Sequence, residues 1–148
     1  MSLIKEITKC KSIFIDTAPF IYFIEAHPKF GPLVKEIFKN LRDDKFIAYT
    51  SVLTITEVLP KPVQMGKEEL VNEFLQFLRQ GKNIYLVEIN SVIAEKAGRL
   101  RGKYLSIKTI DAIQLAVALS VDAGVFLSND ENLKQVKEIK VLILKDYL

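Results

Sequence analysis

The sequence contains very few of the residues that most often build zinc sites and nucleophilic active sites. Cys10 is the only cysteine and His27 the only histidine among 148 residues, and tryptophan is absent. A lone cysteine cannot form an internal disulfide, and one cysteine with one histidine excludes a zinc site of the Cys/His type. Ser-His-Asp and Cys-His systems are excluded unless His27 is the base. Pro28 and Gly31 follow His27 and predict that it lies in a turn that ends a helix.

The sequence also lacks a long uninterrupted apolar run. The longest apolar stretch, residues 110–127, is interrupted by Asp111, Gln114 and Asp122, which favours a buried helix followed by a strand over a membrane span. The first residues, MSLIKEITKCK, contain no apolar core of signal-peptide length. We therefore expect a cytoplasmic protein without a membrane segment. Its net charge of +3 permits a nucleic-acid partner without arguing for one.

Short apolar runs alternate with helical patterns along the chain. A chain of 148 residues is long enough for one domain with a hydrophobic core and too short for two, so we expect a single domain over residues 1–148. Solidly apolar strands that alternate with helices are typical of a parallel sheet covered on both faces. The expected strands are 12–16, 46–49, 84–87, 125–127 and 141–144, and the expected helices are 18–26, 32–41, 51–59, 67–79, 91–104 and 110–121.

Several residues mark the expected helix ends. Ser51 and Thr109 are expected N-caps, and Pro19 is tolerated in the first turn of its helix. Segment 51–59 is ambiguous because its Val, Thr and Ile residues favour a strand, but its apolar spacing fits a helix that Pro60 and Pro62 end. We interpret it as a helix. In 91–104, the expected apolar stripe consists of Val92, Ala97, Leu100 and Tyr104.

Four carboxylates stand in otherwise apolar segments: Asp16, Glu57, Asp111 and Asp130. The surrounding pattern predicts burial at each, and an ionised carboxylate is costly to bury without a partner. Asp16 ends the first expected strand, Asp130 follows the fourth, and Asp111 lies in the first turn of a helix. Sites in open parallel α/β sheets form beyond the carboxyl ends of the strands. The four acids therefore predict one pocket for a hard divalent cation such as Mg²⁺ or Mn²⁺.

The segments that carry these acids resemble those of the PIN domain family, in particular the VapC-type toxins of prokaryotic toxin–antitoxin pairs. The matching stretches occur in the family's order and span essentially the whole chain: IFIDTAPFIYFIE, TITEVL, GRLRGKYLSIKTIDAIQLAVAL and VFLSNDENL. The resemblance implies a three-layer α/β/α sandwich with a central parallel sheet. It also implies endoribonuclease activity with Mg²⁺ or Mn²⁺, an antitoxin partner and a homodimer. The helix APFIYFIEA is the candidate antitoxin contact.

The resemblance also assigns roles to individual residues. The four family acids map onto Asp16, Glu57, Asp111 and Asp130, and we expect Asp16 and Asp111 to be the main metal ligands. Glu57 and Asp130 would complete the metal shell or bind through water, and one of them would take the proton of the attacking water. Residues that would orient these carboxylates are Thr17, Ser128 and Asn129.

Each residue also has a simpler interpretation. Asp16 and Asp130 fit turns, Glu57 fits a solvated helix face, and Asp111 fits the favourable place of an acid at a helix N-terminus. A basic cluster before Asp111 fits either phosphate steering or an ordinary charged surface. This cluster consists of Arg99, Arg101, Lys103 and Lys108.

Three other functions stay open from the sequence. A PIN-like RNA-processing nuclease without a toxin role would contain the same acids. A non-catalytic RNA- or protein-binding module would keep the fold, although four intact acids argue against it. A phosphatase that uses Asp16 as nucleophile would need a second Asp two residues later, where the chain has Ala18.

Overall fold

The computed structural model describes residues 2–148, which form a parallel sheet between two layers of helices. The strands are β1 Ser12–Ile15, β2 Ile47–Ser51, β3 Ile84–Val87, β4 Val125–Ser128 and β5 Lys140–Ile143. Their order is β3-β2-β1-β4-β5, and every neighbouring pair is parallel. The expected α/β/α sandwich with a central parallel sheet is therefore confirmed.

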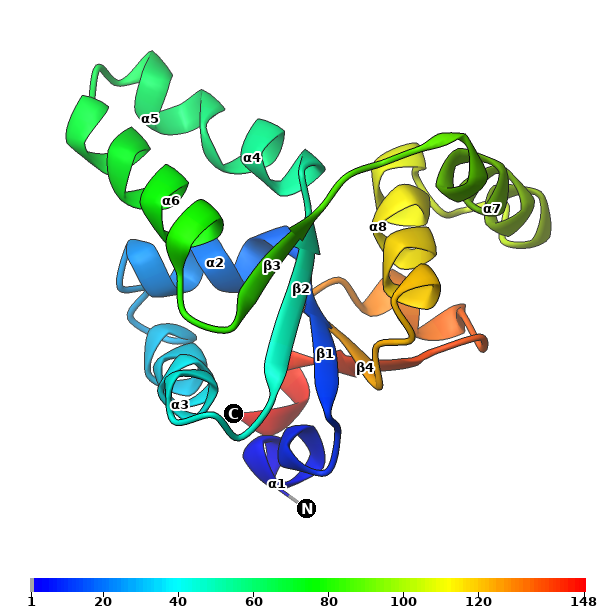
Figure 1. Cartoon of the computed structure of the whole chain (residues 1–148), viewed down its shortest axis with the longest axis horizontal. Helices are drawn as coiled ribbons and strands as arrows, with labels where there is room; N and C mark the ends of the chain where they lie inside the picture. Colours follow the sequence, from blue (N-terminus) through cyan, green and yellow to red (C-terminus); the bar gives the residue numbers. More distant parts are fainter. Residues whose placement is uncertain (1) are drawn as a thin grey trace.

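Helices cover both faces of the sheet, as Figure 1 shows. One layer contains α2 Thr17–Ile24, α3 Gly31–Arg42 and α6 Glu68–Gln80, and the other contains α7 Ser91–Lys103 and α8 Thr109–Ser120. The shorter helices are α1 Leu3–Thr8, α4 Leu53–Val58 and α5 Pro60–Gln64, with 3-10 turns η1 Glu131–Gln135 and η2 Leu144–Tyr147. In the part of the chain that the structure describes, no helix has the length and apolar character needed to cross a membrane.

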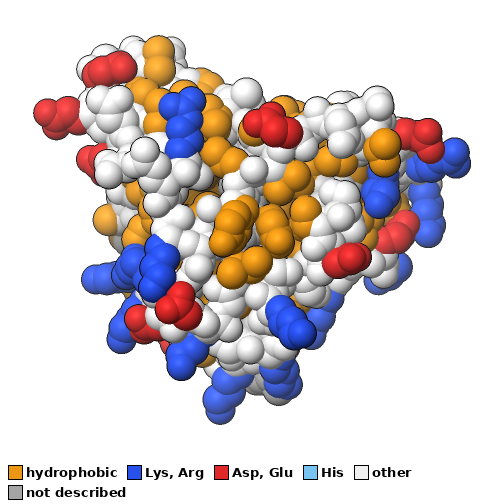
Figure 2. All heavy atoms as spheres, viewed as in Figure 1, with side chains coloured by type: hydrophobic (Ala, Val, Ile, Leu, Met, Phe, Trp, Pro, Cys, Tyr) orange, Lys and Arg blue, Asp and Glu red, His pale blue; other side chains and the backbone are white. Residues whose placement is uncertain are grey.

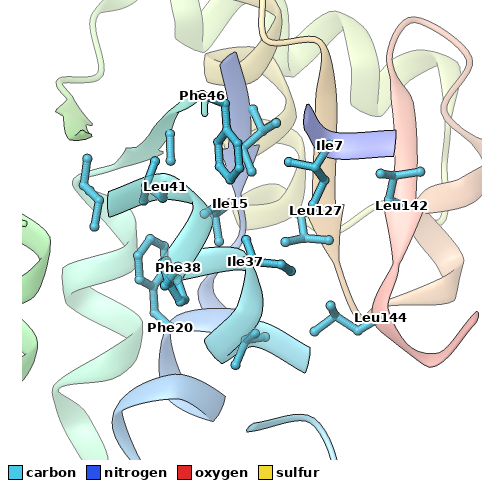
Figure 3. Packing of buried hydrophobic residues seen from close by; sticks show 14 of the residues in the cluster. Ile7, Ile15, Phe20, Ile37, Phe38, Leu41, Phe46, Leu127, Leu142 and Leu144 are labelled. Carbon is cyan, nitrogen blue, oxygen red and sulfur yellow. The ribbon is translucent and has the colours of Figure 1, made fainter. Parts of the chain in front are cut away.

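The central strand β1 supplies both layers of the core. Successive side chains of a strand point to opposite faces, so Ile13 and Ile15 pack beneath α1, α2 and α3, and Phe14 packs beneath α7 and α8. All three side chains are fully buried. Figure 3 shows the buried cluster beneath α1, α2 and α3, where Phe20 of α2 and Phe38 of α3 approach each other. Phe14 of β1 stacks on Phe126 of the neighbouring strand β4, with 5.1 Å between ring centroids.

Several expected boundaries need correction. Thr109 is the first residue of α8 rather than its N-cap; Lys108 is in that place and its side chain makes no capping bond. Helix α4 ends before Pro60 as expected, but Pro60 also begins a further short helix, α5, because proline is tolerated in a first turn. Val92 is 70% exposed, and Ile93 takes its place in the buried stripe of α7.

Two further elements differ from expectation in smaller ways. Helix α1 was not expected from the sequence, although Leu3 and Ile7 bury its inner side. Ser51 precedes the N-cap residue Val52, yet its hydroxyl still accepts the Leu53 N–H at 3.1 Å. The helical interpretation of this segment is confirmed by α4. His27 lies in a turn as expected, where its Nδ1 accepts the backbone N–H groups of Lys29 and Phe30.

The surface in the view of Figure 2 has apolar side chains over its middle and charged side chains mainly towards its outline. The edge strand β3 lies at the front of the same view in Figure 1, and its Tyr85 is half exposed. The sheet edge at β3 is therefore less polar than the surface around it.

Candidate active site

The predicted acids lie at the carboxyl ends of the two central strands and on the helices beside them. Asp16 follows β1 directly and is the N-cap of α2. Asp130 follows β4, Glu57 lies on α4, and Asp111 lies in the first turn of α8. Because β1 and β4 are neighbours in the sheet, Asp16 and Ser128, 112 positions apart in the sequence, are in contact at the carboxyl ends of these strands.

Asp16 is the buried centre of this group. Its Oδ1 accepts the Thr17 N–H at 2.9 Å, and its Oδ2 accepts the Ser128 hydroxyl at 2.8 Å. No Lys or Arg forms an ion pair with it in the part of the chain that the structure describes. Burial raises the pKa of Asp16 from 3.8 to about 6, although these two hydrogen bonds lower it. The charges of Asp111 and Glu57 raise the pKa further.

Thr17 links Asp16 to Glu57. Its backbone N–H binds Asp16, and its hydroxyl donates to Glu57 Oε1 at 2.8 Å. One residue therefore holds two of the acids through two different donors. The sequence predicted burial at Glu57, but the structure exposes it, because this position is on the outer side of α4.

Asp111 is half-buried and lies within electrostatic reach of the remaining acids. Burial raises its pKa most, followed by the charges of Asp130 and Glu57, while the nearby Lys108 lowers it. With the effect of Glu57 and Asp111 on Asp16, these influences connect all four acids into one negatively charged group. The four acids therefore lie at the same end of the sheet and act on one another through their charges.

Asp130 lies at the exposed rim of this acidic group, where the sequence had predicted burial. It is the N-cap of η1, and its Oδ1 accepts the Asn132 N–H at 3.0 Å. Its own N–H donates to Ser128 Oγ at 3.1 Å. Ser128 therefore contacts both Asp16 and Asp130, which fits the role of an orienting hydroxyl that was expected for it.

Asn129 follows β4 and binds the elements next to the acidic group. Its Nδ2 donates to the Tyr22 hydroxyl at 3.2 Å, and its Oδ1 accepts the Lys145 N–H at 3.0 Å. These contacts join the end of β4 to α2 and η2. The hydrogen bonds of Asn129 in residues 2–148 thus reach the surrounding scaffold rather than the four carboxylates.

Comparison with known proteins identifies this arrangement. The family model described as "PIN domain" matches residues 13–139, which include all four acids. The chain belongs to the PIN domain family. A search of the curated proteins found no match for this PIN domain.

Solved structures share the fold of this PIN domain at low sequence identity. VapBC of Salmonella typhimurium, crystallised with DNA, is 15% identical, with a TM-score of 0.71, over 90% of this chain and 98% of that chain. VapBC2 of Rickettsia felis, bound to a promoter DNA fragment, is 15% identical, with a TM-score of 0.68, over 89% and 98%. VapC20 of Mycobacterium tuberculosis, named as a toxin that cleaves the sarcin-ricin loop, is 15% identical, with a TM-score of 0.63, over 77% and 86%.

The donor chemistry of this PIN domain suits a hard divalent cation. The four acids offer only oxygen ligands, and the buried Asp16 is surrounded by other carboxylates instead of a basic side chain. Within residues 2–148, however, no three acidic, His or Cys side chains stand close enough around one point to form a ready metal cage. The acids therefore fit a cation by charge and ligand type.

The basic cluster divides into two kinds of residue. Arg99 pairs with Glu95 at 3.1 Å, and Lys103 pairs with Glu138 at 3.2 Å, as in an ordinary charged surface. Lys108 is different, because its charge acts on Asp111. Arg101 is exposed on the last turn of α7.

The sequence interpretation missed a layer of buried polar side chains behind the acids of this PIN domain. Thr50, Ser51, Thr54 and Gln114 are all fully buried. Gln114 gave a visible signal, because it interrupts the apolar run of α8. The others looked like ordinary residues of a strand or a short helix, and only the fold brings them to Gln114.

Proposed function

We propose that this PIN domain is an endoribonuclease that requires Mg²⁺ or Mn²⁺ and acts as the toxin of a toxin–antitoxin pair. The observation that carries the proposal is the acidic group around Asp16, a buried carboxylate on which the charges of Asp111 and Glu57 act and which has no ion-pair partner in the described residues. A bound cation would stabilise such a group of anions, because an uncompensated buried charge is costly. The fold likeness to VapC20, named as a toxin that cleaves the sarcin-ricin loop, supports the choice of substrate.

In this proposal Asp16 and Asp111 hold the metal, and Glu57 and Asp130 complete its surroundings directly or through water. A bound Mg²⁺ or Mn²⁺ would activate water and stabilise negative charge on the phosphate of RNA. Thr17 and Ser128 keep the carboxylates in place through the hydrogen bonds described above. The more exposed acids, Glu57 and Asp130, are the candidates that take the proton of the attacking water.

Lys108 is the basic residue best placed to attract RNA phosphates. It stands immediately before α8 and its charge reaches Asp111. Arg101 is exposed on the last turn of α7, whereas Arg99 and Lys103 already have acidic partners. We expect RNA affinity to fall with rising salt, because phosphate contacts release counterions.

The toxin role would require an antitoxin that covers the site. Phe20 is fully buried, but Tyr22 and Phe23 are only partly buried, so α2 keeps some apolar surface for a partner. A groove of about 460 Å³ runs from Tyr22 and Glu25 to Glu57, beside the acids. An antitoxin segment in this groove would reach the site. We also propose that the protein forms homodimers and works in the cytoplasm.

The deciding experiment is cleavage of a mixed RNA substrate by the purified protein in Mg²⁺, Mn²⁺ or EDTA, with Asp16→Asn in parallel. We expect cleavage that needs a divalent metal and is lost in Asp16→Asn. Asp44→Asn, at the other end of the sheet, is the matched control and should keep full activity. Cleavage that survives both EDTA and Asp16→Asn would refute the assignment of the site.

The toxin role has its own test in living cells. Induced expression of the wild type should arrest the growth of a bacterial host, and induced Asp16→Asn should not. Metal-dependent RNA cleavage in vitro without growth arrest would favour an RNA-processing nuclease. Metal binding without cleavage would favour a non-catalytic module.

A further inference from the structure

The helices that carry Glu57 and Asp111 are joined by a hydrogen bond inside the protein. Gln114 Nε2 of α8 donates to Thr54 Oγ1 of α4 at 3.0 Å. Both side chains are fully buried. This bond therefore connects α4 to α8 beneath the acidic group and away from solvent.

Ser51 fixes the direction of this connection. Its hydroxyl oxygen accepts the Leu53 N–H at 3.1 Å, so its single hydrogen is free to donate to Gln114 Oε1. With its oxygen bound to Ser51, the Gln114 amide must present its nitrogen to Thr54. Thr54 also shares a hydrogen bond of 2.7 Å with Thr50 at the end of β2. The amide thus has one orientation that satisfies its neighbours.

The spacing of these residues couples the network to the acids. Thr54 precedes Glu57 by three residues on α4, and Gln114 follows Asp111 by three residues on α8. Residues three apart lie on neighbouring parts of a helix surface. The bond between Thr54 and Gln114 therefore lies about one helical turn from each carboxylate.

Helix α4 packs against α2, α6 and β2, and the bond from Gln114 to Thr54 adds a link to α8. Helix α4 contains six residues, and its N-cap residue Val52 makes no side-chain capping bond. Helices of this length are marginal without tertiary contacts. A bond from inside α4 to α8 therefore limits how far the Glu57 backbone can move relative to that of Asp111.

The polar character of the network is informative in itself. Apolar side chains would fill the same space without the requirement that each donor meets an acceptor. In the described residues no buried side-chain nitrogen or oxygen is without a hydrogen-bond partner, so the network is complete. A complete buried network specifies one arrangement of its members rather than many.

We infer that Thr54 and Gln114 are positioning residues that set the separation of Glu57 and Asp111 for metal binding. They do not touch the metal or the RNA, and act through the two acids. The inference rests on the proposed function in so far as Glu57 and Asp111 bind a metal. If the network served only stability, a variant that lacks it but still folds would bind the metal as tightly as the wild type.

The test uses three variants of the whole protein. Thr54→Val removes the hydroxyl and keeps the shape, Thr54→Ser restores the hydroxyl, and Ile7→Val is a buried control on α1 at the opposite end of the sheet. Titration of metal-free protein with Mn²⁺ should show about tenfold weaker binding in Thr54→Val, the size typical of residues that orient ligands. Thr54→Ser and Ile7→Val should bind Mn²⁺ like the wild type.

Hydrogen exchange gives a second readout that needs neither metal nor RNA. Backbone amides of α4 should exchange faster in Thr54→Val than in the wild type, and Ile7→Val should leave them unchanged. If Thr54→Val does not fold, Gln114→Met replaces it, because it removes the amide at similar length. Wild-type Mn²⁺ affinity in a folded Thr54→Val, or unaltered α4 exchange, would overturn the inference. If the wild type neither binds Mn²⁺ nor cleaves RNA, the proposed function fails, and hydrogen exchange alone decides whether the network positions α4.

Discussion

The two ends of the sheet treat their acids in opposite ways. At the amino end, Asp44 accepts hydrogen bonds from Asn83 Nδ2 at 2.8 Å and from Lys82 Nζ at 3.2 Å. These bonds lower the pKa of Asp44. At the carboxyl end, burial and neighbouring acids raise the pKa of Asp16 to about 6. The carboxyl group of Asp44 thus ionises more readily than usual, whereas that of Asp16 ionises less readily.

This difference shows that the surroundings of an aspartate, and not its residue type, decide whether its pKa is raised or lowered. The exposed Asp44 lies in the loop between α3 and β2, and its partners Lys82 and Asn83 lie in the neighbouring loop between α6 and β3. Asp16 has hydrogen-bond donors but no cationic partner in the described residues. Asp44 is balanced by a lysine of the chain, whereas Asp16 has no ion-pair partner in the part of the chain that the structure describes.

The largest expected effect is on stability as a function of pH in metal-free buffer. The pKa of Asp16 in the folded protein, about 6, lies above its ordinary value of 3.8, so the folded state holds this proton more tightly than the unfolded state. The contribution of Asp16 is therefore complete below pH 3.8 and is lost as the pH rises through 6. The difference corresponds to roughly 3 kcal/mol in the free energy of unfolding.

Chemical denaturation between pH 4 and pH 7 would measure this loss. Asp16→Asn removes the titrating group, so its unfolding free energy should change less over the same range. Added Mn²⁺ should recover part of the wild-type stability at pH 7, because a ligand that binds only the folded state stabilises it. A wild-type protein that gains more stability than Asp16→Asn on going from pH 4 to pH 7 would contradict the crowded-acid description.

An intermediate effect is expected when the Ser128 hydroxyl is removed. Ser128→Ala deletes the bond of 2.8 Å to Asp16 and the acceptor of the Asp130 N–H. The pKa of Asp16 should rise further, and Mn²⁺ affinity should fall about tenfold, as is typical when a ligand loses its orienting partner. Ser128→Thr keeps the hydroxyl and is the matched control. Equal Mn²⁺ affinity in Ser128→Ala and Ser128→Thr would show that this hydroxyl does not orient Asp16.

The smallest effect is expected at the amino end of the sheet. Asp44→Asn removes an exposed charge that has a Lys partner, and exposed ion pairs contribute little to stability. The midpoint of thermal unfolding should therefore change little. The change should be larger at low than at high ionic strength, because salt screens the pair. RNA cleavage should stay at the wild-type rate. A clear loss of cleavage would mean that the two ends of the sheet are not independent.

Much of the fold could be predicted because apolar runs report burial directly. Strand β3 occupies the expected residues, and the other strands agree within one or two positions. Helix ends were harder, because proline is compatible with both the end of one helix and the first turn of the next, as Pro60 shows. Thr109 had the right residue type for a cap, but a cap also depends on backbone conformation, which the sequence does not display.

The site could be predicted in composition but not in detail. The four acids were visible as charges in apolar segments, and parallel topology indicated where they would meet. The exposure of Glu57 and Asp130 was not visible, because a pattern of apolar neighbours does not tell which side of a short helix or turn faces solvent. The contact between Thr54 and Gln114 joins residues 60 positions apart, and no local pattern reports such a pair.

The central position of β1 also determines when during synthesis the site can exist. The ribosome releases β1 early, and β1 can pair with β2 soon afterwards, but its other neighbour, β4, emerges more than a hundred residues later. Until then Asp16 lacks the Ser128 hydroxyl, and Asp130 has not been made. A growing chain therefore contains no assembled acidic group while most of it is still being translated. The assembly of the acidic group therefore depends on the pairing of β1 with β4, which is formed between segments far apart in the sequence.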